Sequence, residues 1–144
     1  MARILVIEDD PVNAELFDLV LSRMAHHTVT VTEDGDKALA LYNNGSVDGV
    51  IMDVSLSNTF LDGAAVDGLR LSKAMKSGPN GATIPVLLAT AHAMRDDMEN
   101  FLIASAADDY ISKPIVDFAK LVDAVERLLE KVRQHRSVVS STAG

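Results

Sequence analysis

The chain has 144 residues, of which 48% are hydrophobic, and it contains no cysteine, so disulfides, thiolate catalysis and cysteine-based zinc sites are excluded. Its net charge of −8 at pH 7 argues against direct binding to nucleic acid or to an anionic membrane. No stretch approaches the roughly 20 apolar residues of a membrane helix, and the N-terminus becomes acidic too early for a signal peptide. We therefore expect a cytoplasmic protein.

Strands and helices are predicted to alternate along the chain. The run RILVIE is typical of a buried strand. In the segment that follows it, Asp10 can cap a helix and Pro11 suits the first helical turn. In chain order, the expected elements are strand 3–8, helix 9–24, strand 27–32, helix 34–45, strand 47–54, helix 67–78, strand 84–90, helix 94–105, strand 109–112 and helix 118–134.

This alternation predicts the architecture of the domain. Strands that are separated by helices of this length pair in parallel and carry helices on both faces of the sheet. The sequence therefore indicates an α/β fold with one doubly wound, five-stranded parallel sheet. We expect a single domain over residues 1–135 and a flexible C-terminal tail over 136–144, because the last residues are small and mostly polar.

Acidic residues follow two of the predicted strands. Glu8, Asp9 and Asp10 end the first strand, and Asp53 lies within the apolar run of the third. If these strands are neighbours, their carboxyl ends meet at one edge of the sheet, where open parallel sheets bind ligands. Clustered carboxylates repel each other and need a cation, and Mg²⁺ prefers oxygen ligands. The sequence therefore predicts a magnesium site at this edge.

Two further side chains are predicted to lie at the same edge. Lys113 follows the fifth strand, and Thr90 ends the fourth. An aspartate beside Mg²⁺, an ammonium group and a hydroxyl has the parts needed to accept a phosphoryl group, with Asp53 as the attacking oxygen. Such a role also explains why a carboxylate stands in a buried strand, where a lone charge is costly.

The segments ILVIEDDP, VIMDVSL, LLATAHAM and DDYISKPI, in this order and spacing, resemble the receiver domain of bacterial two-component response regulators. The resemblance covers roughly residues 2–131, nearly the whole chain. It implies the flavodoxin-like receiver fold, whose five-stranded sheet has the strand order 2-1-3-4-5. It also implies a phosphoprotein that takes part in two-component or phosphorelay signal transduction.

The resemblance assigns roles at the predicted edge. Asp53 matches the phosphoacceptor of the family, and Lys113 matches its phosphate-contacting lysine. Glu8 and Asp9 match the acidic pair that holds Mg²⁺ together with Asp53 in the family. The resemblance also implies that the backbone carbonyl of Ser55 is a ligand of the ion.

A conformational switch is implied as well. Thr90 matches the switch hydroxyl of the family, and Tyr110 matches its aromatic switch residue. The peptide bond between Lys113 and Pro114 matches a bond that is cis in the family, which the proline makes possible.

Simpler roles are also open for these residues. Asp9 and Asp10 can cap the helix that follows them, and Lys113 can be a solvated surface side chain. Thr90 and Tyr110 can be ordinary packing residues of their strands.

The expected function is that of a stand-alone response regulator. It would receive a phosphoryl group from a sensor histidine kinase or a histidine phosphotransfer protein and then bind a downstream effector protein or pass the group on. Such a protein is no conventional turnover enzyme, although it assists its own phosphorylation and dephosphorylation. The alternatives are a phosphorylation-independent pseudo-receiver and a haloacid-type phosphatase, and the phosphatase lacks its second acid because Ser55 stands there.

The chain departs from the family pattern in two places. The segment 56–67 lacks the proline that usually follows the phosphoacceptor strand, and it carries roughly seven extra residues, so we consider both a partner-contacting or gating loop and a tolerated surface insertion. Ala106 replaces the glycine that commonly ends the fourth helix. A left-handed conformation at this alanine would cost about 1 kcal/mol.

Overall fold

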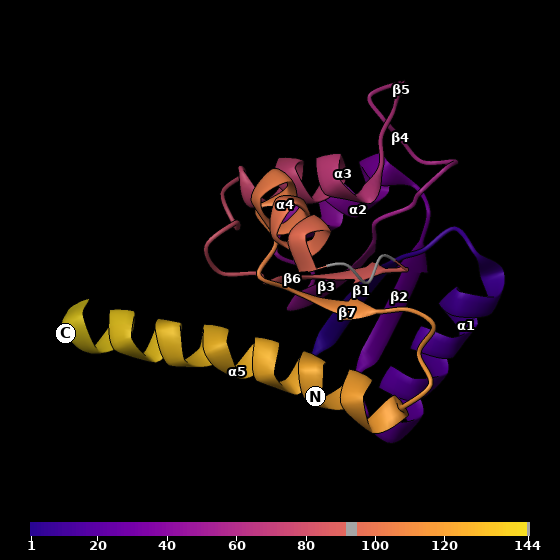
Figure 1. Ribbon diagram of the computed structural model, residues 1–144. Helices are drawn as coiled ribbons and strands as arrows, with labels where there is room; N and C mark the ends of the chain where they lie inside the picture. The colour runs from indigo at the N-terminus through magenta and orange to yellow at the C-terminus, as the bar shows by residue number, and fades with distance from the viewer. Residues whose placement is uncertain (92–94, 144) are drawn as a thin grey trace.

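The structure is a computed structural model that describes residues 1–91 and 95–143. Its centre is a parallel five-stranded sheet with the order β2-β1-β3-β6-β7, which is the 2-1-3-4-5 order predicted for the five main strands (Figure 1). The predicted doubly wound α/β fold is therefore confirmed. The strands are β1 (Arg3–Ile7), β2 (Thr28–Thr32), β3 (Gly49–Asp53), β6 (Val86–Thr90) and β7 (Asp109–Ser112).

Helices cover both faces of the sheet, because the side chains of each strand alternate between two apolar cores. Every residue of β3 and β6 is buried, as expected for central parallel strands. One core joins the sheet to α2 (Gly35–Asn43), α3 (Gly68–Lys76) and α4 (Arg95–Ser105). The other joins it to α1 (Pro11–Leu19), the π-helical turn η1 (Val20–Met24) and α5 (Phe118–Ala143).

Two helices differ from their predicted bounds by more than two residues. The helix expected over 9–24 is α-helical only to Leu19 and ends in the π-helical turn η1, which a 3.6-residue periodicity does not reveal. The last helix continues from the expected end at 134 to Ala143, so the predicted tail is helical in the structure (Figure 1). Among the described helices, none has the length and low polarity needed to cross a membrane.

The unusual segment 56–67 forms a small β-hairpin. Its strands are β4 (Phe60–Leu61) and β5 (Ala64–Ala65), and the connecting residues Asp62 and Gly63 both have positive φ, as a type I′ turn requires. The hairpin projects on the side of α2 and α3 (Figure 1). It is attached to α2 by a hydrogen bond in which the N–H of Asp62 donates to Asp36 Oδ1 at 2.9 Å.

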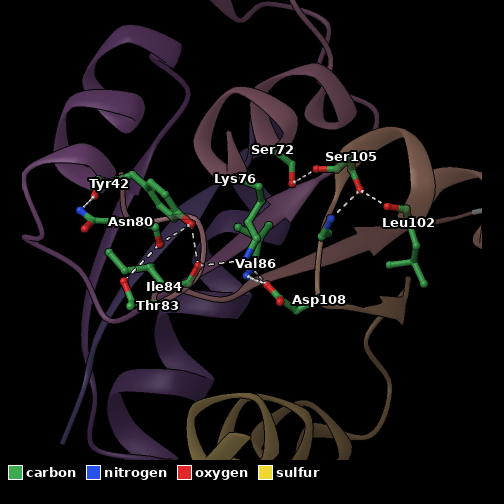
Figure 2. Close-up of polar contacts among 11 residues, drawn as sticks. Tyr42, Ser72, Lys76, Asn80, Thr83, Ile84, Val86, Leu102, Ser105 and Asp108 are labelled. Atoms are coloured by element: carbon green, nitrogen blue, oxygen red, sulfur yellow. Dashed lines mark hydrogen bonds and ion pairs between the residues drawn. The ribbon is translucent and has the colours of Figure 1, made fainter. Parts of the chain in front are cut away.

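A polar network fastens the edge of the sheet where β6 and β7 begin (Figure 2). Asp108 Oδ2 accepts from Lys76 Nζ and from the N–H of Val86, both at 2.8 Å. Nearby, the hydroxyl of Tyr42 donates to the carbonyl oxygen of Ile84 at 2.6 Å. The donors and acceptors of this network are matched, so it ties α2, α3 and β6 together without excess charge.

The turn between α4 and β7 contains the second departure from the family pattern. Ala106 has a φ of 57°, so the left-handed conformation expected of a glycine is kept with an alanine. The preceding Ser105 supports the turn, since its hydroxyl accepts from the N–H of Ala107 at 3.1 Å (Figure 2). The carbonyl oxygen of Ser105 also accepts from the Ser72 hydroxyl in α3 at 3.0 Å.

Candidate functional site

Three acidic side chains meet at the carboxyl edge of the sheet. Glu8 and Asp9 follow β1, Asp53 is the last residue of β3, and the two strands pair in parallel with Ile7 opposite Met52. One carboxylate oxygen from each acid lies within 4.8 Å of the others. The predicted convergence therefore exists in the structure. Asp10 instead caps α1, because its side chain accepts from the N–H of Val12 at 3.2 Å.

Lys113 directly follows β7, and its side chain contacts two of these acids. Its Nζ lies 2.9 Å from Asp53 Oδ1 and 3.4 Å from Glu8 Oε1. The backbone of Lys113 is held by its N–H, which donates to the carbonyl oxygen of Thr90 at 2.8 Å. The Lys113–Pro114 bond is cis, as the resemblance implied. Lys113 is thus a half-buried partner of the acids and not a fully solvated surface side chain.

The charges of this cluster are unbalanced, since one ammonium group faces three carboxyl groups. Glu8 and Asp53 are each only 3% exposed. Burial, followed by the hydrogen bond and the charge of Asp53, raises the pKa of Glu8 to about 7. Burial lowers the pKa of Lys113, but its hydrogen bond and ion pair with Asp53 and the charge of Glu8 outweigh this effect, so its pKa is raised overall.

These residues fit a hard divalent cation. The second oxygen of Glu8, Oε2, is buried and has no hydrogen-bond partner among the described residues, which is a costly state for a carboxylate. A magnesium ion takes carboxylate oxygens and keeps several waters, so it can satisfy such an oxygen and reduce the repulsion among the acids. The donor set of the edge therefore matches the ion that the sequence predicts.

The other predicted site residues lie around the acids. Thr90 is the fully buried last residue of β6 and follows Ala89, which pairs with Asp53. The N–H of Ser55 donates to Asp53 Oδ1 at 3.2 Å. Tyr110 lies in β7 opposite Leu88 and is 37% exposed. The metal role of the Ser55 carbonyl and the switch roles of Thr90 and Tyr110 stay predictions.

One residue of the site was missed by the sequence reasoning. Ser57 belongs to the hairpin segment, and both its N–H and its hydroxyl donate to Asp9 Oδ2, at 2.8 and 3.0 Å. Nothing in the local sequence signals this contact, because the two residues are 48 positions apart. The only hint was that the segment departs from the family pattern.

Comparison with known proteins gives, over most of the chain, the family that the sequence motifs resemble. Residues 4–126 match the model of the response regulator receiver domain. The hybrid signal transduction histidine kinase I of Dictyostelium discoideum is 32% identical over 115 residues, which cover 78% of this chain and 6% of the kinase. The DNA-binding dual master transcriptional regulator RpaA of Synechocystis is 33% identical over 132 residues, which cover 91% of this chain and 50% of the regulator. The chain thus spans half or less of these relatives.

A solved structure shares the fold over most of the chain. The receiver domain of the sensor histidine kinase PA1611 from Pseudomonas aeruginosa superposes with a TM-score of 0.74 and 29% identity, and the match covers 90% of this chain and 98% of that domain. That structure has a magnesium ion coordinated in its active-site cleft. The matched family model begins at Ile4, within β1, and extends through the other four strands of the sheet.

Proposed function

We propose, since this chain belongs to the family of response regulator receiver domains, that Asp53 accepts a phosphoryl group from a phosphohistidine with the help of Mg²⁺. The donor would be a sensor histidine kinase or a histidine phosphotransfer protein. The phosphorylated chain would then bind a downstream effector protein or pass the group on. The observation that carries the proposal is the pairing of buried Asp53 with Lys113 at 2.9 Å beside an acid with an unpartnered oxygen.

The chemistry begins at the carboxylate of Asp53. Lys113 and the N–H of Ser55 both contact Oδ1, which leaves Oδ2 as the oxygen that we expect to attack. An O–P bond forms as the P–N bond of the phosphohistidine breaks, and the imidazole leaves with the bonding electron pair. The product is an acyl phosphate on Asp53.

The charge that develops on the phosphoryl oxygens needs neutralising groups. Glu8, Asp9, Asp53 and the backbone carbonyl of Ser55 are the residues that we expect to hold Mg²⁺, which would supply positive charge to those oxygens. Lys113 is close enough to Asp53 to transfer its ion pair from the carboxylate to the new phosphoryl group. Water that enters the same site would hydrolyse the acyl phosphate, so the chain would assist its own dephosphorylation.

Signal output would follow from a shift between two conformations. The hydroxyl of Thr90, at the same edge, would donate to a phosphoryl oxygen, and Tyr110 would turn inward as Thr90 moves. Tyr110 is half-exposed on the edge strand β7, so such a rotation changes a surface that a partner can read.

The test is phosphorylation of Asp53→Asn. We expect incubation of the wild-type chain with Mg²⁺ and acetyl phosphate to add the mass of one phosphoryl group, and the variant to gain none. Asp62→Asn is the matched control, because the same chemical change is made in the exposed hairpin turn, where an asparagine accepts the positive φ.

Two outcomes would contradict the proposal. Continued labelling of Asp53→Asn would move the acceptor to another residue. A wild-type chain that binds Mg²⁺ but gains no phosphoryl group, either from acetyl phosphate or from a phosphorylated phosphotransfer protein, would favour a pseudo-receiver that acts by binding alone.

A further inference from the structure

The hairpin segment contacts one of the three clustered acids directly. Both donors of Ser57 reach the same oxygen of Asp9, the N–H at 2.8 Å and the hydroxyl at 3.0 Å. Hydrogen bonds to a charged acceptor are stronger than those between neutral groups, and two donors on one oxygen restrict the rotation of the carboxylate. The other oxygen of Asp9 is left for a cation.

Asp9 needs such support more than its neighbours do. Glu8 and Asp53 are buried, and the ammonium group of Lys113 contacts these two acids. Asp9 is only half-buried and shares the cluster with two other carboxyl groups, so repulsion favours rotation of its side chain toward solvent. Within the part of the chain that the structure describes, Ser57 is the residue whose hydrogen bonds oppose that rotation.

The segment that carries Ser57 is itself anchored to the domain. The preceding Leu56 is buried in the core that contains α2 and α3. The segment is closed at its base, where the N–H of Gly68 donates to the carbonyl oxygen of Val54 at 3.1 Å. The backbones approach so closely there that a Cβ on Gly68 would lie 1.9 Å from the carbonyl oxygen of Asp53.

We propose that Ser57 is a positioning residue that holds Asp9 in its metal-binding orientation before the ion arrives. The affinity of the acidic edge for Mg²⁺ is then set partly by the hairpin segment and not by the acids alone. Hydrogen bonds to the ligands of a metal commonly act in this way, because they reduce the reorganisation that binding requires. This inference rests on the proposed magnesium-dependent function.

The first test is a calorimetric titration of the unphosphorylated chain with Mg²⁺. We expect Ser57→Ala to weaken binding roughly three- to tenfold, which is less than the usual loss for such residues because the backbone N–H remains. Ser57→Thr keeps both donors and should bind almost as the wild type does. Ser77→Ala is the control, since that hydroxyl donates only to Lys73 at the end of α3.

A second test separates positioning from ordinary stabilisation. Thermal unfolding without metal is compared for the wild type, Ser57→Ala, Asp9→Ala and the double variant. If Ser57 acts through Asp9, Ser57→Ala lowers the melting temperature of the wild type by several degrees and changes that of Asp9→Ala by much less. Equal shifts in both backgrounds would overturn the inference, and so would a folded Ser57→Ala chain with unchanged Mg²⁺ affinity.

The results also separate this inference from the proposed function. Mg²⁺ binding by the wild type with no effect of Ser57→Ala removes only the role of Ser57. A clear effect of Ser57→Ala on Mg²⁺ affinity, without phosphorylation of Asp53, removes only the phosphoacceptor role. A wild type that fails to bind Mg²⁺ overturns both the positioning role and the magnesium-dependent step.

Discussion

A lysine–aspartate pair stands at each end of the sheet, and the two pairs differ in what surrounds them. At the amino edge, Lys76 and Asp108 lie 2.8 Å apart, and the backbone of β6 supplies Asp108 with a further donor (Figure 2). At the carboxyl edge, Lys113 and Asp53 lie 2.9 Å apart, but Glu8 and Asp9 add two more acids. The first pair is balanced and the second is not.

A lysine–aspartate ion pair by itself therefore does not mark a functional site. A balanced pair with matched hydrogen bonds has nothing to gain from a ligand, so it serves the fold. An edge with surplus buried carboxylate, a raised pKa and an unpartnered oxygen is stabilised when a cation binds. Three substitutions and one pH series test this distinction between the two edges.

The largest expected effect is at the amino edge. Asp108→Ala removes the acceptor of both Lys76 and the Val86 N–H, so we expect the free energy of unfolding to fall by about 3 kcal/mol. Urea denaturation at pH 7 without metal measures this loss. The Mg²⁺ affinity of the folded variant should not change, and a tenfold weaker affinity would show that the two edges are coupled.

The matching substitution at the carboxyl edge should change the free energy of unfolding in the opposite direction. Glu8→Gln removes a buried acid whose pKa is raised, so at pH 8 and without metal we expect the free energy of unfolding to rise by roughly 2 kcal/mol. The variant should also bind Mg²⁺ at least tenfold more weakly, because it lacks one ligand. Destabilisation of the metal-free variant would mean that Glu8 supports the fold as Asp108 does.

The same group gives the metal-free protein a pH dependence. The folded state raises the pKa of Glu8 from 4.5 to about 7, so folding favours its protonated form. The stability that protonated Glu8 contributes is fully present below pH 4.5, and it is lost as the pH rises to about 7. Melting temperatures of the wild type and Glu8→Gln, measured in chelator from pH 4.5 to 8, should therefore diverge. Parallel curves would contradict the raised pKa.

The smallest expected effect concerns the turn beside the amino edge. Ala106 has a φ of 57°, a conformation that glycine adopts without strain. We expect Ala106→Gly to raise the free energy of unfolding by about 0.5 kcal/mol, because the relief of strain exceeds the added entropy of the unfolded chain. The melting temperature measures this gain, and Mg²⁺ affinity is the control. A loss of stability would show that contacts of the alanine methyl outweigh the strain.

Much of the acidic edge was predictable because it depends on strand topology. The acids after β1, Asp53 in β3, Thr90 in β6 and Lys113 after β7 all end strands of one parallel sheet, and such ends necessarily meet. The hairpin was not predicted, since the sequence showed only extra residues. Its Asp62–Gly63 turn is nevertheless a recognisable hairpin signal.

The C-terminal helix shows a limit of local reasoning. Its last residues are small and mostly polar, so the sequence favoured an end near 134. In the structure the helix runs to Ala143. Extending a helix that already exists costs far less than starting one, and the packed first half of α5 supplies that start.

Periodicity and chain order encode the alternation of strands and helices locally. This alternation was enough to predict the parallel sheet and the acids and lysine at its carboxyl edge. Which charges are balanced, in contrast, could not be predicted, because it depends on contacts between distant segments. Ser57 meets Asp9 across 48 residues, and Lys76 meets Asp108 across 32. Such contacts depend on how separate segments pack, and burial then sets the energy of each charge.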